Sequence, residues 1–389
     1  MSDPFQLGDR LRQRREQHLY RRRRALHSAQ GTHIQCDGKP LLNFCSNDYL
    51  SLANHPRLIS AAKKAVNTFG VGSGASHLVI GHSRLHQQLE ERLADWVGRP
   101  RALLFSTGYM ANMGVISALL KRGDTVFQDK VNHASLLDGA QLSRARLVRY
   151  PHCDTEHLQR LLSATDTPSL VVTDSIFSMD GDVAPLMDMA RTCQNENAWL
   201  MVDDAHGLGV LGRGKGVLAE YNLSQSDVPV YMATLGKALG SYGAFVAGSD
   251  DLIEFLIQFS RSYIYTTAIP PAIAAASLES LSLLETETWR IDRLHSLIDY
   301  FRRAAAARQL PILSSQSAIQ PFMIGDSERA VQISEKLQAC GILVGAIRPP
   351  TVPVNTARLR ITLQADHQEI EIDQLLDTLV SVFHQTDQQ

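Results

Sequence analysis

The sequence of 389 residues lacks several features that would mark whole classes of protein. No uncharged apolar run approaches the roughly 18 residues that a membrane-spanning helix requires, so we expect no membrane association of that kind. The first residues, MSDPFQLGDR, contain no hydrophobic signal core, and we therefore expect a cytoplasmic protein. The 5 cysteines are scattered without a CxxC pair, which argues against a disulfide framework and against a cysteine-rich zinc site.

The chain also lacks an excess of charge of either sign. Its formal net charge is −2, which is not the signature of a protein that binds nucleic acid. The local exception is RLRQRREQHLYRRRR (10–24), and for most of its arginines we expect a solvated, basic helix. One or two of them could bind a carboxylate or a phosphate, because the guanidinium group suits both anions. Nucleic acid is disfavoured because this basic stretch is short and is not interleaved with aromatic residues.

What the chain does contain is a long alternation of strand and helix patterns. Several of the predicted strands are nearly continuous apolar runs, as expected for strands covered on both faces. The alternation predicts an α/β fold with a mainly parallel sheet wrapped by helices, and ligands gather at the carboxyl ends of such strands. The predicted strands are 101–105, 125–128, 145–150, 169–174, 198–204, 228–233 and 244–248, and helices are predicted over 111–120, 156–164 and 184–194.

The pattern changes near residue 285, and 389 residues exceed one ordinary core, so two domains are expected. We predict an N-terminal arm with a short strand pair over 1–50, a large domain over 51–284 and a smaller α+β domain over 285–389. In the smaller domain we expect helices over 290–309 and 327–340, strands over 320–325, 343–347 and 358–363, and a last helix.

One lysine stands in unusual surroundings. TLGKALGSYGA (234–244) places Lys237 among glycines and small residues, directly after the apolar run 228–233. An ammonium near a core is costly unless something pairs with it or changes its state. Such a lysine can extend its charge to water, or it can be held covalently or act as a base, since a desolvated lysine alters its charge readily.

A second unusual stretch is VDDAHGLGVLG (202–212), in which Asp203 ends a buried strand. It contains GxGxxG, but a dinucleotide site needs the glycines to open a helix, and RGKGV follows here instead. A buried carboxylate needs a cationic partner. No metal-ligand spacing lies nearby, so that partner could be the protonated ring nitrogen of a cofactor, and we predict no residue that holds a metal ion.

Four further pieces are weak when taken singly. FSTGYMANMG (105–114) turns from a strand into a helix, where backbone amides can bind a phosphate. His133 begins a helix, and a helix cap would explain it. Ser178 follows a strand, where its hydroxyl could simply serve a turn. Thr234 lies close to Lys237, and a turn would explain it as well. Together with Lys237 and the aspartate they supply what pyridoxal phosphate requires, namely a lysine, an acid for the ring nitrogen and phosphate anchors.

These motifs, together with NHASLLDG, FSMDGD, GSGASH (72–77), SNDYLSL (46–52) and ARLRITL (357–363), resemble the α-oxoamine synthases. The resemblance covers about 40–365 and implies a fold-type I pyridoxal-phosphate enzyme. It implies that Lys237 holds the cofactor and acts as a base, that Asp203 keeps the ring nitrogen protonated, and that His133 stacks on the ring. The cofactor-binding residues that it implies are Gly108, Tyr109, His133, Ser178, Asp203, His206, Thr234, Lys237 and Thr267.

For the substrates the resemblance implies Arg21, Asn47, Ser76, His133, Thr351 and Arg360. Arg360 would bind the carboxylate of the amino acid, and it is preferred to Arg358 by resemblance alone, since residues at i and i+2 of a strand point the same way. Arg21 would reach the far carboxylate of the acyl chain, although Arg22, Arg23 and Arg24 leave the register open.

The implied reaction is the decarboxylative condensation of L-alanine with a pimeloyl thioester, carried by coenzyme A or by acyl carrier protein, in biotin biosynthesis. The implied assembly is a homodimer in which Thr267 reaches the phosphate of the partner subunit. Alternatives are another α-oxoamine synthase, such as glycine C-acetyltransferase or 5-aminolevulinate synthase, and a cofactor-free relative that acts as a binding or regulatory subunit. A nicotinamide-dependent oxidoreductase is disfavoured by the context of GxGxxG.

Overall fold

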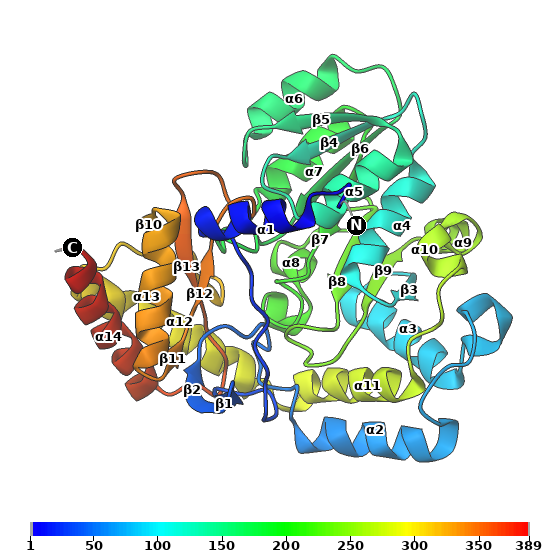
Figure 1. Cartoon of the computed structure of the whole chain (residues 1–389). Helices are drawn as coiled ribbons and strands as arrows, with labels where there is room; N and C mark the ends of the chain where they lie inside the picture. Colours follow the sequence, from blue (N-terminus) through cyan, green and yellow to red (C-terminus); the bar gives the residue numbers. More distant parts are fainter. Residues whose placement is uncertain (1–2, 388–389) are drawn as a thin grey trace. The chain divides into compact units, whose positions relative to one another are not determined.

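The computed structural model describes residues 3–387 and divides into two compact units (Figure 1). The larger unit comprises residues 48–178 and 182–292, and the smaller unit comprises the N-terminal residues up to 47, residues 179–181 and the chain from 293 onward. The sequence prediction treated 1–50 as an arm of its own. In the structure the residues up to 47 fall in the same unit as the chain from 293 onward, and β2 (Lys39–Asn43) pairs with β11 (Ile342–Leu343).

The larger unit is built on a 7-stranded sheet of order β3-β9-β8-β7-β6-β4-β5. Neighbours among β4 to β8 are parallel, whereas β9 runs antiparallel to both β3 and β8, so the predicted, mainly parallel sheet is confirmed. The strands are β3 (Arg101–Phe105), β4 (Thr125–Asp129), β5 (Arg146–Tyr150), β6 (Ser169–Asp174), β7 (Trp199–Asp203), β8 (Val230–Thr234) and β9 (Ala244–Gly248).

Helices connect these strands and complete the unit. Figure 1 shows α2 and α11 lying side by side. The longer helices are α2 (Pro56–Phe69), α3 (Arg84–Val97), α4 (Gly108–Leu119), α5 (Ala134–Ser143), α6 (Thr155–Ser163), α7 (Leu186–Asn195), α9 (Asp250–Phe259) and α11 (Pro271–Thr286). Short ones are η1 (His77–Gly81), η2 (Gly212–Gly214), α8 (Val217–Glu220) and α10 (Arg261–Ile264).

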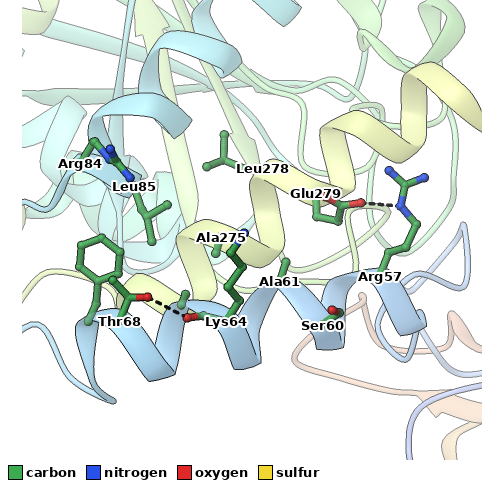
Figure 2. Close-up of a pocket in the computed structure, with 12 residues that line it drawn as sticks. Arg57, Ser60, Ala61, Lys64, Thr68, Arg84, Leu85, Ala275, Leu278 and Glu279 are labelled. Carbon is green, nitrogen blue, oxygen red and sulfur yellow. Dashed lines mark hydrogen bonds and ion pairs between the residues drawn. The ribbon is translucent and has the colours of Figure 1, made fainter.

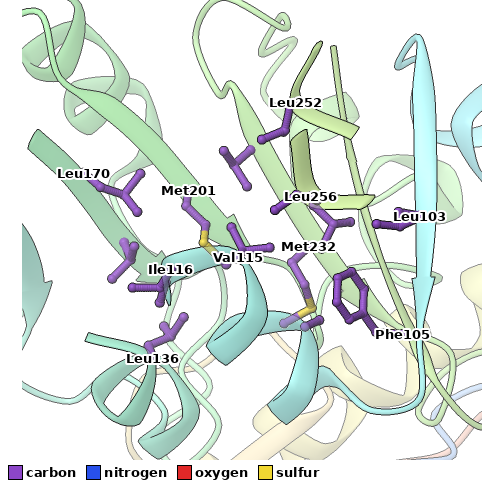
Figure 3. Packing of buried hydrophobic residues seen from close by; sticks show 14 of the residues in the cluster. Leu103, Phe105, Val115, Ile116, Leu136, Leu170, Met201, Met232, Leu252 and Leu256 are labelled. Atoms are coloured by element: carbon purple, nitrogen blue, oxygen red, sulfur yellow. The ribbon is translucent and has the colours of Figure 1, made fainter. Parts of the chain in front are cut away.

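The main core of the larger unit lies between the sheet and helices α4, α5 and α9. Figure 3 shows Val115 and Ile116 of α4 facing side chains of the strands, among them Met201 and Met232. These strands and this helix are apolar on the faces that meet, and each fully buried aliphatic side chain contributes about 1.5–3 kcal/mol relative to an exposed one. The core therefore holds the strands rigidly, and their carboxyl ends become fixed points from which the turns extend.

The smaller unit contains two 3-stranded sheets, of order β1-β2-β11 and β10-β13-β12. In the first, β2 from the N-terminal segment pairs in parallel with β11 from the C-terminal part. The second is antiparallel. The elements are β1 (His33–Cys36), β2 (Lys39–Asn43), α12 (Trp289–Ala307), β10 (Ile319–Gly325), α13 (Ser327–Ala339), β11 (Ile342–Leu343), β12 (Gly345–Ile347), β13 (Ala357–Thr362) and α14 (Glu369–Asp387).

The basic N-terminal stretch differs from the prediction. The helix expected across 10–24 is shorter and begins earlier, as α1 (Leu7–Glu16). It ends there because the next turn is left-handed at His18, with φ of 56°, and Arg21–Arg24 follow outside any helix. No residue of α1 is buried, as a solvated basic helix requires. Among residues 3–387, no helix combines the length and the apolar character needed to cross a membrane.

Candidate active site

Lys237 lies in a tight turn between β8 and β9. Thr234, the last residue of β8, donates its hydroxyl to the carbonyl of Gly243 at 2.9 Å and accepts from the amide of Gly236 at 3.3 Å. Gly240 has a φ of 62°, and a Cβ there would approach the amide nitrogen of Ala53 to 2.4 Å. The glycine-rich sequence therefore allows the turn to pack against neighbouring backbone and holds Lys237 partly buried.

The lysine contacts an imidazole that is itself bound to a tyrosine. Lys237 Nζ lies 3.0 Å from His206 Nε2, and His206 Nδ1 lies 2.6 Å from the hydroxyl of Tyr49. When the lysine is protonated it can only donate, and Nε2 then accepts while the ring proton lies on Nδ1, facing the tyrosine oxygen. Tyr49 is fully buried, and the sequence analysis did not identify it as a site residue. The only signal for it was its place within SNDYLSL.

Asp203 is held at the end of β7 by two donors. Its Oδ2 accepts from the amide of Asn112 at 2.7 Å, and its Oδ1 accepts from the backbone of Ala205 at 3.0 Å. Asn112 also donates to Ser135 Oγ at 2.8 Å, and its own Oδ1 is buried with no hydrogen-bond partner among the described residues. Asn112 was missed as well, although a single amide in an otherwise apolar helix is the signal that could have found it.

The neighbouring Asp204 has a different environment and a structural role. It accepts from Ser175 Oγ at 2.5 Å, from the hydroxyl of Tyr231 at 2.7 Å and from the amide of Val217 at 2.8 Å. Burial raises the pKa of Asp204 to about 6, against these hydrogen bonds. A Cβ at Gly207 would approach its Oδ1 to 2.1 Å. The first glycine of GxGxxG, Gly207, therefore makes room for the carboxylate of Asp204. The stretch 202–212 leads only into short helical turns.

His133 caps the helix α5, as one interpretation of the sequence expected. Its Nδ1 accepts from the amide of Ser135 at 3.3 Å, and its own amide donates to Asp174 Oδ2 at 2.7 Å. Burial lowers the pKa of His133, which the charge of Asp203 opposes and that of Lys237 reinforces. Burial and the charge of Asp203 raise the pKa of Asp174. These mutual effects mean that the lysine, the imidazole and the two carboxyl groups lie in one electrostatic neighbourhood.

The phosphate-binding turn predicted before residue 111 is in fact the first turn of α4, which begins at Gly108. Thr107 caps it by accepting from the amide of Met110 at 3.1 Å. The first amides of a helix have no partner within it and can bind an anion. Tyr109 donates to Asp138, and its ring stands edge-on to that of His133, with centroids 6.1 Å apart.

Ser76 and Thr267 lie close to the start of this helix. They form an isolated bridge between two backbone segments, and Ser106 Oγ donates to the carbonyl of Thr267 at 3.5 Å. Thr267 is exposed, whereas Ser76 is half-buried. The larger unit thus contains most of the predicted cofactor-binding residues on neighbouring strand ends and on the turns that follow them. Ser178, half-buried, is the last residue of its first segment.

The remaining predicted residues, Arg21, Asn47, Thr351 and Arg360, belong to the smaller unit. Both terminal nitrogens of Arg360 donate to Asn47 Oδ1 at 3.1 Å, and one of them also donates to Thr362 Oγ1 at 3.1 Å.

Arg358, on the same strand β13, instead forms an ion pair with Asp180 and donates to the carbonyl of Thr356 at 3.0 Å. The structure therefore distinguishes two arginines that the spacing could not. Arg21 donates to Thr351 Oγ1 at 3.3 Å on the surface.

A separate pocket of about 490 Å³ lies along α2 and α11 and includes none of the predicted site residues. Figure 2 shows its walls, where Arg57 of α2 pairs with Glu279 of α11 at 2.5 Å. This pairing fixes the two helices to one another and neutralises part of the basic wall that Lys64 and Arg84 contribute.

Comparison with known proteins places this geometry in a family. Residues 39–379 match the family "Aminotransferase class I and II". The chain is 58% identical to an 8-amino-7-oxononanoate synthase of Nitrosococcus oceani, with 96% of this chain and 99% of the relative covered. Among solved structures it resembles a serine palmitoyltransferase from S. paucimobilis with bound PLP, at 29% identity, 98% and 97% coverage and a TM-score of 0.92. It also resembles an 8-amino-7-oxononanoate synthase from Francisella tularensis, at 32% identity, 89% and 98% coverage and a TM-score of 0.78.

Proposed function

Because the chain belongs to the class I and II aminotransferase family, among the 8-amino-7-oxononanoate synthases, we propose that it condenses L-alanine with a pimeloyl thioester. The products are 8-amino-7-oxononanoate, CO2 and the free thiol, in biotin biosynthesis. The enzyme is an acyltransferase that depends on pyridoxal phosphate. The observation that carries the chemistry is the partly buried lysine held 3.0 Å from an imidazole.

The residues of the larger unit fit this cofactor. Asp203 is a buried carboxylate. The hydrogen bonds described above come from two uncharged N–H groups, those of Asn112 and Ala205, so a cationic ring nitrogen would complete its environment. The first turn of α4 offers amides for a phosphate. When bound, pyridoxal phosphate supplies an electron sink for a carbanion at the α-carbon of the amino acid.

Lys237 would hold the cofactor covalently and afterwards remove the α-proton of alanine. An ordinary lysine has a pKa near 10.4 and is a poor base at neutral pH. Lys237 is partly buried and lies 3.0 Å from His206 Nε2, and only as the neutral amine can it remove a proton. His206 in turn is oriented by Tyr49, so that Nε2 faces the lysine. His206 and Ser178 would also form hydrogen bonds with the phenolic oxygen of the cofactor ring.

Asp203 would keep a proton on the ring nitrogen. Asn112 and the amide of Ala205 fix the orientation of the carboxylate before anything binds, which removes the cost of ordering it later. His133, kept neutral by burial, would stack on the ring and contact the substrate without adding a second positive charge beside the lysine. Gly108, Tyr109 and Thr234 would hold the ring edge and the phosphate.

Arg360 would bind the carboxylate of alanine. A guanidinium group grips a carboxylate through two parallel hydrogen bonds, which fixes the orientation of the α-carbon. Its two terminal nitrogens already point to one acceptor, Asn47 Oδ1, so the fork is oriented in advance. Arg358 is the poorer candidate because its charge is engaged by Asp180. Ser76 and Thr351 would line the substrate site, and Arg21 would reach the far carboxylate of the pimeloyl chain.

We propose a homodimer in which Thr267 reaches the phosphate of the partner subunit; its exposure supports this role. Sedimentation of cofactor-loaded protein as a stable monomer would refute the dimer. We also propose the cytoplasm as its compartment, since all 5 cysteines are free thiols, two of them buried, as is typical of a reducing environment.

The activity is tested with purified protein, pyridoxal phosphate and L-alanine, with pimeloyl-CoA or pimeloyl-acyl carrier protein as the second substrate. We expect thioester-dependent release of CO2 and formation of 8-amino-7-oxononanoate, detected by mass spectrometry. The faster donor identifies the natural thiol. If glycine or serine reacts and alanine does not, the enzyme is another α-oxoamine synthase. Borohydride should trap a pyridoxyl group on Lys237, and trapping elsewhere would refute its assignment.

A further inference from the structure

A second group of reactive side chains lies at the carboxyl ends of three adjacent parallel strands. Asp129 ends β4, His152 and Cys153 follow β5, and Asp182 lies beyond β6. The register that pairs Asp129 with Tyr150 brings the turn after β5 next to the end of β4. None of these four residues contributes to the proposed reaction.

Asp129 orients the imidazole of His152. Its two carboxylate oxygens lie 3.0 and 3.1 Å from His152 Nδ1, and one of them accepts from the amide of Cys153 at 2.7 Å. The Asp129 side chain is 1% exposed. Phe177 supports the ring edge-on, with centroids 4.4 Å apart. A carboxylate that accepts from one ring nitrogen, while the other nitrogen faces outward, is the arrangement found behind histidines that bind zinc.

The outward nitrogen faces an oxygen and a sulfur. His152 Nε2 lies 2.8 Å from Asp182 Oδ2, and the sulfur of Cys153 lies 3.7 Å from each of the two ring nitrogens and 4.0 Å from the same oxygen. Asp182 Oδ1 is buried and has no hydrogen-bond partner among residues 3–387. An imidazole nitrogen, a carboxylate oxygen and a thiol sulfur thus lie within 4.0 Å of one another, on a partly exposed face of the molecule.

We propose that His152 Nε2, Asp182 Oδ2 and Cys153 Sγ bind one zinc ion, with Asp129 holding the imidazole from behind. Tetrahedral zinc with bonds of about 2.0–2.3 Å separates such donors by roughly 3.3–3.6 Å. The three observed separations bracket that range. Because Sγ lies equally far from the two ring nitrogens, the Cys153 side chain must turn toward Nε2 when the ion binds. The mixture of nitrogen, sulfur and oxygen favours zinc over magnesium or calcium, and water would take the fourth position.

Binding exchanges protons for the metal. Although burial opposes it, the hydrogen bonds that the ring donates to Asp129 and Asp182 raise the pKa of His152 to about 12, so the metal-free ring is an imidazolium between two carboxylates. Zinc replaces the proton on Nε2 and the proton of the thiol, and both protons pass to the solvent. The ion would join two turns directly, those after β5 and β6, and through His152 it would also hold Asp129, from which the chain leads to His133.

A separate histidine cluster, near β3 at the other edge of the sheet, provides the control. His77 and His82 face one another through their Nδ1 atoms at 2.8 Å. The third member, His86, already uses both nitrogens, one at 2.9 Å from the amide of Ser83 and the other at 2.7 Å from the carbonyl of Ile269. That cluster therefore presents no face of three available ligands, and zinc should not prefer it.

The test is equilibrium dialysis of the chelator-treated, cofactor-loaded protein against Zn²⁺, with the metal quantified by elemental analysis. We expect about one equivalent that is lost, or bound at least about tenfold more weakly, in Cys153→Ser and in Asp182→Asn. The matched controls Cys340→Ser, which removes an exposed thiol elsewhere, and His82→Asn should bind as the wild type does. Co²⁺ should give a thiolate-to-metal absorption band that Cys153→Ser abolishes.

Two results would overturn the site: no zinc equivalent on the wild type, or equal affinity in the wild type and Cys153→Ser. Loss of the equivalent in His82→Asn but not in Asp182→Asn would place the metal in the histidine cluster and also refute the proposal. His152→Gln is not used alone because it removes two ion pairs and can unfold the turn. Cys153→Ser removes neither, and circular dichroism of each variant checks its fold.

Discussion

The two units hold their functional side chains on their strands in different ways. In the larger unit Asp203, His206 and Lys237 lie at or beyond the carboxyl ends of β7 and β8, at the point where the strand gives way to a turn. In the smaller unit Arg358 and Arg360 lie within β13, and both are buried. Groups that exchange protons lie on turns, where a side chain can change partners, whereas arginines with a permanent charge are fixed in a hydrogen-bonded ladder.

The largest effect on activity is expected at the turn between β8 and β9, which carries Lys237. Lys237→Ala should lower the turnover rate by at least about 100- to 10,000-fold, because it removes both the attachment of the cofactor and the base. Steady-state kinetics with alanine and pimeloyl thioester, followed by mass spectrometry after borohydride treatment, check this. Lys237→Arg is the matched control, since it keeps a cation but cannot hold the cofactor covalently. Activity within tenfold of wild type in either variant would contradict the assignment.

Within β13, substitutions of the two arginines should differ in their effect on catalysis. Arg360→Lys should lower kcat/KM for alanine by about 10- to 100-fold, because a hydrogen bond to a charged group contributes roughly 1.5–3 kcal/mol and the fork is lost. Arg358→Lys should leave the KM for alanine unchanged and reduce thermal stability instead, since it weakens the pair with Asp180. Equal kinetic effects of the two substitutions would remove the distinction between these positions.

A titratable group of the smaller unit should affect stability rather than chemistry. His367 lies within hydrogen-bonding distance of the carbonyl of Asn43 at 3.1 Å, accepts from the amide of Gln364 at 2.9 Å and stacks on Phe44. Burial lowers its pKa to about 4. The unfolded chain, with a pKa near 6.5, binds the proton first, so the stability contribution of neutral His367 is lost as the pH falls from about 6.5 to 4.

His367→Gln keeps the hydrogen-bonding capacity but does not titrate. The variant should therefore lose less stability than the wild type between pH 6.5 and pH 4, by up to about 3 kcal/mol. Urea denaturation at a series of pH values measures this difference. A pH dependence as steep as that of the wild type would mean that His367 is not the responsible group.

The smallest effect is expected at Tyr49. Tyr49→Phe keeps the ring but removes the hydrogen bond to His206 Nδ1, which corresponds to about 0.5–1.5 kcal/mol, or a two- to tenfold loss in kcat. Because the tyrosine acts through the imidazole, the pH profile of kcat should shift while the KM for alanine stays constant. An unchanged pH profile together with a lower melting temperature would indicate a purely structural role.

How far the sequence predicted the fold can be judged from particular elements. The predicted strands 101–105, 169–174 and 244–248 agree with β3, β6 and β9 residue for residue, because each contains an apolar run of at least three residues. The start of α4 was placed three residues too late, since FSTGYM carries no strong helical periodicity and the cap at Thr107 is a local hydrogen bond. The pairing of β2 with β11 joins residues about 300 apart, which no local pattern reports.

Some residues of the candidate site could likewise be predicted from the sequence, and others could not. Lys237, Asp203 and His206 could be identified from the sequence, because a lysine among glycines and an acid at the end of an apolar strand are each costly without a partner. Tyr49 and the distinction between Arg358 and Arg360 could not, since partners such as His206 and Asp180 come from distant segments. For Asn112 the sequence offered a signal, an amide in an apolar helix, but not its partner Asp203. The sequence by itself thus determined which chemical groups follow each strand. Tertiary structure alone decided which of them meet, because the order of strands in the sheet sets every contact between their ends.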